Sequence, residues 1–396
     1  MSRPAEQPDG ENTSLAMPSG SGNRFNLAEL AGAFGDLGTL IPFTVAYNKM
    51  LGVDPVGLLL AFGISMIVVG SYYKTPMPVQ PMKAIGAIAT TQAAQTAVIT
   101  AGAVYGAALA TGLIWLVLGA TGTAKWAARI MSRPIMLGIV LGLGLSFMLD
   151  GARLMASGWW LSALALFFTL LLLRNRIIPA MFLLLAAGVA IALMRDPGLL
   201  AALGDVHPTP RLPAIALGAI SWHDLLIGTV FLAIPQVPLT LGNAVLAITE
   251  ENNRLFPDHR VSERKIAVST GLMNLLGGSI GGVPMCHGAG GMAGHVAFGA
   301  RTGGATIMLG GLLLVLALFF GPSVGLFFQM VPPEILGVIL FLAGAQLALG
   351  SCDFSKDKGE RFVTVLTAGL SLWNVGIAFL IGLAVYHALK RRWIRL

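Results

Sequence analysis

The chain has 396 residues, of which 56% are hydrophobic and only 11% are charged. A soluble domain carries about 25% charged residues, so this composition excludes a large soluble core and indicates a polytopic membrane protein. The net charge of +7 does not indicate a nucleic-acid partner, because the basic residues are scattered through short loops. Cys286 and Cys352 are the only cysteines, which excludes a disulfide framework and a CxxC metal site.

Residues 1–23 are rich in Ser, Gly, Pro, Glu and Asn and predict a disordered cytoplasmic tail. Apolar stretches of membrane length follow, several of them near the lower limit for crossing a bilayer. The last one is long enough for one tilted span or a hairpin of two. The stretches lie near residues 27–48, 54–73, 99–120, 134–150, 157–173, 177–194, 222–249, 265–280, 303–320, 334–350 and 362–388, with two broken segments at 76–98 and 282–300.

The distribution of Lys and Arg predicts the topology. Five clusters of Lys and Arg occur at residues 125–133, 174–176, 254–265, 356–361 and 390–395. With a cytoplasmic N-terminus, all five lie inside if the chain crosses the membrane about 14 times, which puts the C-terminus inside too. The proline-rich 195–221 segment then lies outside and separates two halves of about seven crossings. Because seven is odd, the second half starts on the opposite side, which is the geometry of an inverted repeat. The predicted divisions are 1–23 (tail), 24–195 (first repeat), 196–221 (connector) and 222–396 (second repeat).

Two apolar spans, roughly two hundred residues apart, are each interrupted by a proline-containing string. One is Thr75-Pro-Met-Pro-Val-Gln-Pro-Met-Lys83 and the other is Gly281-Gly-Val-Pro-Met-Cys-His-Gly-Ala-Gly-Gly291. Each predicts extended backbone before a short apolar helix. Interrupted spans at corresponding positions of two halves point to the binding site of a transporter, because backbone at membrane depth has to line a protected cavity.

The two breaks predict an anion site. Pro81 suits the first turn of a half-helix over 82–98, and a second half-helix begins at 286–288. Two facing helix N-termini bind an anion through backbone N–H groups and their partial positive charge. Gly288, Gly290 and Gly291 let the backbone approach a tetrahedral oxyanion closely. The alternative is a pair of proline kinks packed against neighbouring helices.

Lys83 and Asp36 are charged residues inside spans, where a charge is costly and has a partner or a function. Lys83 either complements the anion, pairs with Asp36 or reaches an interface. Asp36 either carries the coupling proton, since burial favours a protonated carboxyl, or makes a structural salt bridge or helix cap.

Uncharged polar residues at matching depths of the two halves suit hydrogen bonds to oxyanion oxygens or between helices. His287 is a candidate donor to the anion, and His295 is predicted to be a packing residue. With no carboxylate near them in sequence, neither a metal site nor a cofactor is predicted. The predicted substrate-binding residues are Thr39, Gln80, Pro81, Met82, Lys83, Ala84, Gln236, Thr240, Asn243, Cys286, His287, Gly288, Ala289 and Gly290, with Asp36 as the coupling residue.

Three strings, Phe34-Gly-Asp-Leu-Gly-Thr39, Pro76-Met-Pro-Val-Gln-Pro-Met-Lys-Ala-Ile85 and Pro235-Gln-Val-Pro-Leu-Thr-Leu-Gly-Asn-Ala-Val245, resemble those of the molybdate-transporter branch of the sulfate-permease superfamily. The resemblance covers nearly all of the chain after residue 24. It implies an all-α fold of seven plus seven inverted segments, divided into a core and a gate domain. It also implies that the third and tenth segments are half-helices that meet at the midplane.

We therefore expect a secondary active transporter in the cell membrane that imports a tetrahedral oxyanion by alternating access. The resemblance implies molybdate. Sulfate or tungstate, which share its charge and shape, and an anion channel remain alternatives, whereas no catalytic constellation indicates an enzyme. The expected partners are the oxyanion and the lipid bilayer, with a proton or Na⁺ as the coupling ion and a homodimer as the candidate assembly.

Overall fold

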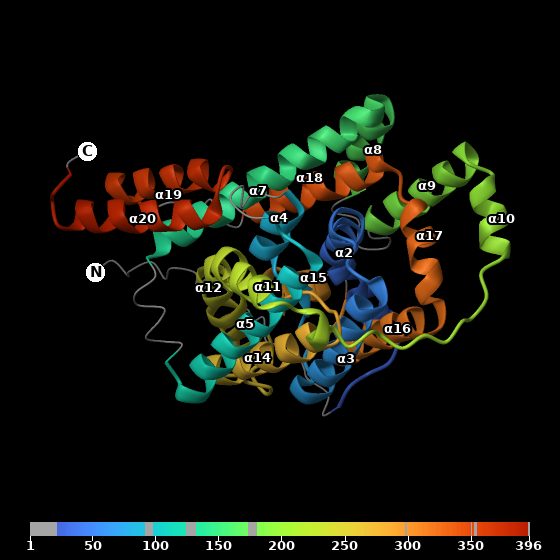
Figure 1. Cartoon of the computed structure of the whole chain (residues 1–396), viewed down its shortest axis with the longest axis horizontal. Helices are drawn as coiled ribbons and strands as arrows, with labels where there is room; N and C mark the ends of the chain where they lie inside the picture. Colours follow the sequence, from blue (N-terminus) through green and yellow to red (C-terminus); the bar gives the residue numbers. More distant parts are fainter. Residues whose placement is uncertain are drawn as a thin grey trace, which may run out of the picture.

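The computed structural model is almost entirely α-helical over the residues that it describes, which are 22–91, 98–123, 132–172, 180–297, 299–349, 351 and 355–394 (Figure 1). The first half contains α1 (Leu27–Ala33), η1 (Phe34–Asp36), α2 (Leu37–Leu51), α3 (Pro55–Tyr73), α4 (Lys83–Thr91), α5 (Ala101–Thr121), α7 (Arg133–Met155), α8 (Trp159–Leu172) and α9 (Ala180–Arg195). The second half contains α11 (Trp222–Ile227), α12 (Ile234–Leu239), α13 (Ile248–Leu255), α14 (Glu263–Ser279), α15 (Ala289–Ala297), α16 (Gly304–Phe320), α17 (Val324–Gln329), α18 (Pro333–Leu349), α19 (Lys358–Ser371) and α20 (Val375–Lys390).

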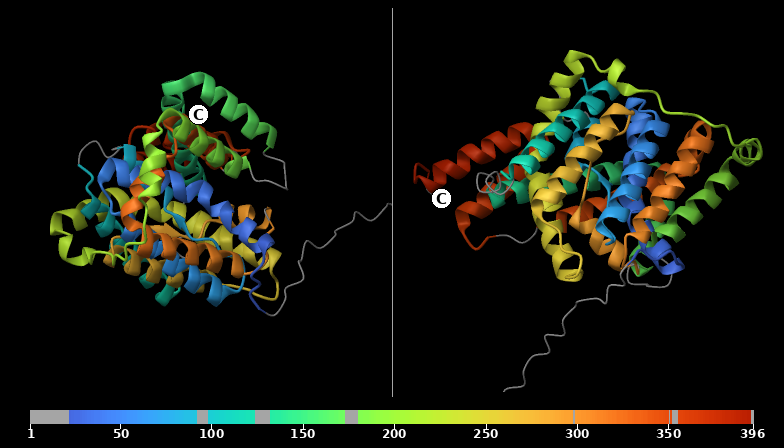
Figure 2. Two further views of the ribbon diagram at one scale, coloured as in Figure 1. Left: turned by 90° about the vertical axis from the view of Figure 1, so that its right-hand side faces the viewer. Right: turned by 90° about the horizontal axis from the view of Figure 1, so that it is seen from below.

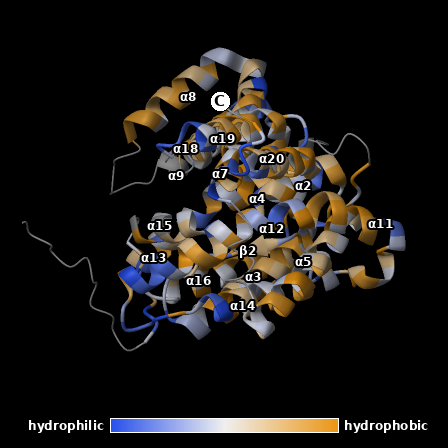
Figure 3. Ribbon diagram, turned by 90° about the vertical axis from the view of Figure 1, so that its left-hand side faces the viewer, coloured by the Kyte–Doolittle hydropathy of each residue, from blue (hydrophilic) through white to orange (hydrophobic). Residues whose placement is uncertain are grey.

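The predicted all-α polytopic membrane architecture is confirmed. Among the described residues, five helical segments are long and apolar enough to cross a membrane, or six if one bent pair counts as a single span. The other helices are shorter, so the number of about 14 crossings stays a prediction. Figure 3 shows hydrophobic residues along most of α8, whereas α13 is hydrophilic. The five segments are Pro55–Tyr73, Ala101–Thr121, Arg133–Leu172, Trp222–Leu255 and Gly304–Phe327.

Glycines bring the longest helices into close contact. At the α7–α18 interface a β-carbon on Gly344 would lie 2.6 Å from the carbonyl oxygen of Gly144, so only glycine fits there. Small residues allow such close backbone approach in a membrane, where packing rather than a hydrophobic drive holds helices together. The same seven-residue spacing recurs in three helix pairs: Gly63 and Gly70 of α3 with Gly303 and Gly310 at α16, Gly112 and Gly119 of α5 with Gly271 and Gly278 of α14, and Gly144 and Gly151 of α7 with Gly337 and Gly344 of α18.

The connector between the halves runs along the side of the molecule (Figure 2). It contains α10 (Gly198–Gly204) and then an extended segment that is tied to α16. The N–H groups of Thr209 and Arg211 donate to the carbonyls of Phe319 and Leu318 at 2.8 and 2.9 Å. These two bonds hold the extended part of the connector against the C-terminal end of α16.

The two ends of the chain refine the predicted boundaries. Most of the predicted tail, 1–21, lies outside the described residues, but Asn23 is already anchored, because its side chain donates to the carbonyl of Gly70 at 3.2 Å. At the other end, the 362–388 stretch is a hairpin, since α19 and α20 pack against each other. Of the two sequence alternatives for this stretch, the hairpin is the one observed.

The helix from Trp222 to Leu255 changes from α-helical to π-helical hydrogen bonding on both sides of its centre. Two π-helical segments, η4 (Gly228–Ala233) and η5 (Thr240–Ala247), flank α12, which contains Pro235 and Pro238. Proline has no N–H and cannot complete the i→i−4 hydrogen bond, so the helix adapts locally. Such π segments are frequent at functional sites, and η5 contains the predicted site residues Thr240 and Asn243.

Candidate functional site

The two breaks meet in the interior of the molecule. The two-residue strands β1 (Gln80–Pro81) and β2 (Met285–Cys286) pair antiparallel, with Gln80 opposite Cys286 and Pro81 opposite Met285. The N–H of Met82 donates to the carbonyl of Pro284 at 2.8 Å and extends the ladder. The prolines exclude a helix here, so the extended backbone satisfies its polar groups by pairing with the other break. The half-helices α4 and α15 start directly after these strands (Figure 1).

Asn274 of α14 holds β2 from its other side. Its Oδ1 accepts the N–H of Met285 at 3.0 Å, and its Nδ2 donates to the carbonyl of Met285 at 2.6 Å. The side-chain amide therefore replaces a third strand. Asn274 was not among the residues predicted from the sequence, although a buried Asn within an apolar helix is a signal for such a role.

Gln236 caps the N-terminus of α4. Its Oε1 accepts the N–H groups of Ala84 and Ile85 at 2.9 and 3.2 Å, while its Nε2 donates to Oγ1 of Thr240 at 2.9 Å. Gln236, Thr240 and the backbone N–H groups of α4 were predicted to bind the anion. In this structure their hydrogen bonds are instead made to one another, because a buried helix end needs partners for its free N–H groups.

The N-terminus of α15 is different. The N–H groups of Ala289 and Gly290 form no hydrogen bond within the described part of the chain, and Gly290 is exposed. A β-carbon on Gly290 would meet nothing within 4 Å, whereas one on Gly288 would lie 2.5 Å from Oε1 of Gln80. The two glycines, both predicted to leave room for an oxyanion, therefore differ: Gly288 packs against a side chain and Gly290 faces open space.

Lys83 and Asn243 add two more side-chain donors. Lys83 is half-buried and makes no ion pair or side-chain hydrogen bond with any described residue. Asn243 is also half-buried and without a hydrogen bond to the described residues, and its Nδ2 lies 3.6 Å from the β-carbon position of Gly288. Lys83 therefore does not form the ion pair with Asp36 that was one sequence alternative.

Asp36 is fully buried and pairs with His295. Oδ2 of Asp36 lies 3.1 Å from Nε2 of His295 and accepts the N–H of Val79 at 3.3 Å, while Oδ1 accepts Nε2 of Gln80 at 2.8 Å. His295 is buried and hydrogen-bonded, as expected of the predicted packing residue, but it also faces a carboxylate that is distant in sequence. Asp36 and His295 are 259 positions apart, and only the fold brings η1 against α15.

The remaining predicted residues are engaged with the protein. Nδ1 of His287 donates to the carbonyl of Pro78 at 2.8 Å and Nε2 contacts the hydroxyl of Ser269, so a bond from His287 to an anion would replace one of these. Oγ1 of Thr39 donates to the backbone carbonyl of Asp36 at 3.1 Å. The side chains of Met82 and Cys286, and Pro81 with them, are buried at the crossing of the two strands.

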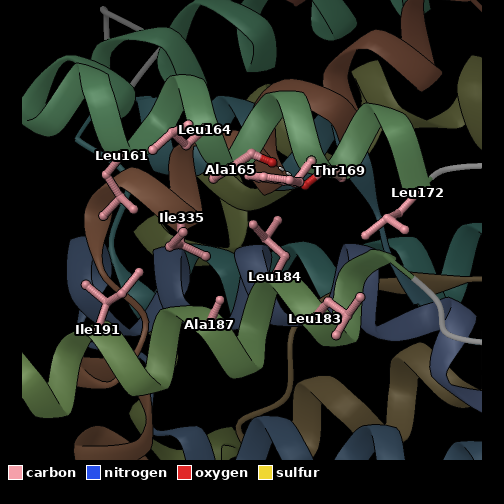
Figure 4. Close-up of a pocket in the computed structure, with 11 residues that line it drawn as sticks. Leu161, Leu164, Ala165, Thr169, Leu172, Leu183, Leu184, Ala187, Ile191 and Ile335 are labelled. Atoms are coloured by element: carbon pink, nitrogen blue, oxygen red, sulfur yellow. Dashed lines mark hydrogen bonds between the residues drawn. The ribbon is translucent and has the colours of Figure 1, made fainter.

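A separate cavity of 360 Å³ lies between α8 and α9 (Figure 4). Its wall is apolar apart from Thr169, so it offers no charge and no set of donors to an oxyanion. This cavity is therefore separate from the candidate anion site at the two breaks. Its lining residues are Leu161, Leu164, Ala165, Phe168, Thr169, Leu172, Leu183, Leu184, Ala187, Ile191 and Ile335.

Solved structures with a similar fold are anion transporters. SLC26A9 has a TM-score of 0.64 at 12% identity, covering 92% of this chain and 64% of its own. The transmembrane domain of the cyanobacterial bicarbonate transporter BicA has a TM-score of 0.57 at 16% identity, covering 92% and 98%. Such identities show the fold alone.

Sequence relatives identify the family. A family model described as "Molybdate transporter of MFS superfamily" matches residues 28–147 and 228–347, and each stretch contains one break. Molybdate transporter 2 and Molybdate transporter 1 of Arabidopsis thaliana are 33% and 31% identical, covering 92% and 93% of this chain and 88% and 89% of theirs. Because the family is described as part of the MFS superfamily, the sulfate-permease placement holds for the fold only. The chain belongs to the molybdate transporter family, and it is a membrane transporter of anions rather than an enzyme.

Proposed function

We propose that the chain is a secondary active transporter that imports molybdate by alternating access. The choice of molybdate is supported by the names of the relatives across most of the chain. Tungstate and sulfate share the tetrahedral shape and charge of molybdate, so discrimination among them belongs to the test.

The observation that carries the proposal is a set of donors at the crossed breaks that form no hydrogen bond with any described residue. The set consists of Nζ of Lys83, the amide of Asn243 and the N–H groups of Ala289 and Gly290. A helix N-terminus and a lysine both favour an anion. A tetrahedral dianion beside these donors would accept hydrogen bonds from all of them. It would also be the negatively charged partner of the Lys83 ammonium.

This donor set is narrower than the one expected from the sequence. The anion would bind mainly at α15, while Gln236, Thr240 and the N–H groups of Ala84 and Ile85 hold α4 in place. Gln80 and His287 would support the site indirectly, since Gln80 already donates to Asp36 and His287 to the carbonyl of Pro78.

The transport cycle is part of the proposal. Core and gate domains related by an inverted repeat would move against each other around the crossed breaks, with both termini in the cytoplasm and the 195–221 segment outside. Asp36 lies beside the first turn of α15 and would carry the coupling proton. The cell membrane is the proposed location.

Uptake by the purified full chain in liposomes tests the function. We expect saturable molybdate uptake that an inward proton gradient accelerates and that tungstate competes with more strongly than sulfate. Protein-free liposomes are the control. Absence of uptake would contradict the proposal, and a sustained anion current without saturation in bilayer recordings would identify a channel instead.

A further inference from the structure

We infer that Asp36 and His295 together form a buried proton-binding site, and that the single proton they share controls the affinity for the anion at α15. The inference rests on the proposed function and assigns to His295 a role that the sequence does not suggest. Both residues are 0% exposed, and Nε2 of His295 lies 3.1 Å from Oδ2 of Asp36.

The hydrogen-bond partners determine how many protons the pair holds. Nδ1 of His295 lies 3.0 Å from the carbonyl oxygen of Pro76, and a carbonyl only accepts, so Nδ1 carries a hydrogen. The two other contacts of Asp36 are donors, the N–H of Val79 and the amide of Gln80. Without a further proton, the lone pair of Nε2 would face a carboxylate oxygen, and two buried acceptors would lie in contact. One proton on either atom removes this conflict.

His287 provides an internal comparison. Its Nδ1 also donates to a carbonyl, that of Pro78, but its Nε2 faces the hydroxyl of Ser269, which can donate. A neutral imidazole therefore satisfies every partner of His287. Of these two fully buried histidines, His295 is the one that faces a carboxylate and needs the additional proton.

The surroundings of the pair contain few charges. Glu29 of α1 accepts the N–H groups of Arg301 and Thr302 at 3.1 Å, and the charged residues of α13 are exposed or paired with one another. With its proton the pair is neutral, and without it the pair carries one negative charge. The charged or titratable groups that act on the pair are Glu29, Lys83, Cys286 and His287.

This charge lies next to the proposed anion site. Oδ1 of Asp36 is 2.8 Å from the β-carbon position of Gly291, in the first turn of α15. The N–H groups of Ala289 and Gly290 in this turn make no hydrogen bond to a described residue. Loss of the proton would set a negative charge beside the donors for a dianion and weaken its binding. By linkage, a bound anion raises the affinity for the proton by the same factor by which the proton raises the affinity for the anion. The anion and the proton would therefore bind, cross and leave together.

Calorimetric titration of molybdate into the purified full chain tests the inference. Between pH 5 and 9, in two buffers with different ionisation enthalpies, we expect proton uptake on binding that approaches one per anion. The affinity should fall about tenfold per pH unit at the alkaline end. A constant affinity without proton uptake across this range would overturn the inference and leave the proposed function standing. Absence of binding at every pH would refute the proposed function itself.

Two matched variants locate the proton. His295→Gln keeps an amide donor toward Asp36 but cannot titrate, so the carboxylate keeps its negative charge and we expect weakened molybdate binding with a flat pH profile. His287→Gln should keep the wild-type pH slope whatever its affinity, and His223→Gln, at an exposed position, is the neutral control. A wild-type slope in His295→Gln would overturn the assignment. If this variant does not fold, proton uptake by the wild-type chain decides.

Discussion

Replacing Lys83 by methionine separates anion binding from folding. The substitution keeps the length of the side chain and removes a charge that forms no ion pair within the described part of the chain. Removal of an unpaired, half-buried charge leaves no protein group without its partner, so we expect no fall in the unfolding temperature. A lysine used for folding would show the opposite pattern.

The expected loss of affinity follows from the contact that Lys83 would make. A hydrogen bond to a charged group contributes about 1.5–3 kcal/mol, which corresponds to roughly a 10- to 150-fold increase in the Kd for molybdate. The upper part of this range applies if the ammonium is desolvated by the bound anion, as expected in the interior of the chain.

Equilibrium binding of molybdate to the purified variant, together with its thermal unfolding, provides the measurement. Lys49→Met is the matched control, because Lys49 is an exposed lysine at the end of α2 and far in sequence from the breaks. The control should bind like the wild type. An unchanged Kd in a folded Lys83→Met protein would refute the reasoning and assign Lys83 to packing or to an interface.

Other substitutions test further parts of the structure. Gly290→Val, which fills open space, should abolish molybdate binding without lowering the unfolding temperature; binding that persists would remove α15 from the site. Gln236→Ala should lower the free energy of unfolding by about 0.5–2 kcal/mol through loss of a helix cap, as measured by denaturation. Gly344→Leu should destabilise the chain by at least about 1–3 kcal/mol, whereas Gly311→Leu, with nothing within 4 Å, should not. A cysteine at Asp205 should be labelled from outside intact cells, and exclusive labelling from the cytoplasm would contradict the topology.

The sequence predicts the two breaks because their cause is local. Proline cannot continue a helix, so Pro76, Pro78 and Pro81 demand extended backbone wherever they lie. The start of α4 at Lys83 agrees with the predicted position of the half-helix within one residue. The 50 glycines are likewise a local signal of close helix packing, because small residues let membrane helices approach each other.

The use of each polar side chain could not be predicted, since it depends on contacts between distant segments. Gln236 and Asn243 are both amides of the same helix, yet one caps α4 and the other donates to no residue in the described part of the chain. The pairing of Asp36 with His295 joins η1 to α15, and nothing in the local sequence of either residue indicates its partner. Asn274 was missed for the same reason.

The location of bound molybdate tests the central claim most directly. Molybdenum scatters anomalously, so an anomalous difference map from crystals grown with molybdate identifies the ion without interpretation of its shape. We predict one molybdenum peak beside the N–H groups of Ala289 and Gly290 and Nζ of Lys83. The oxyanion oxygens around this peak should lie about 3 Å from each of these donors. A peak elsewhere, with these three donors still unoccupied, would contradict the assignment of the site.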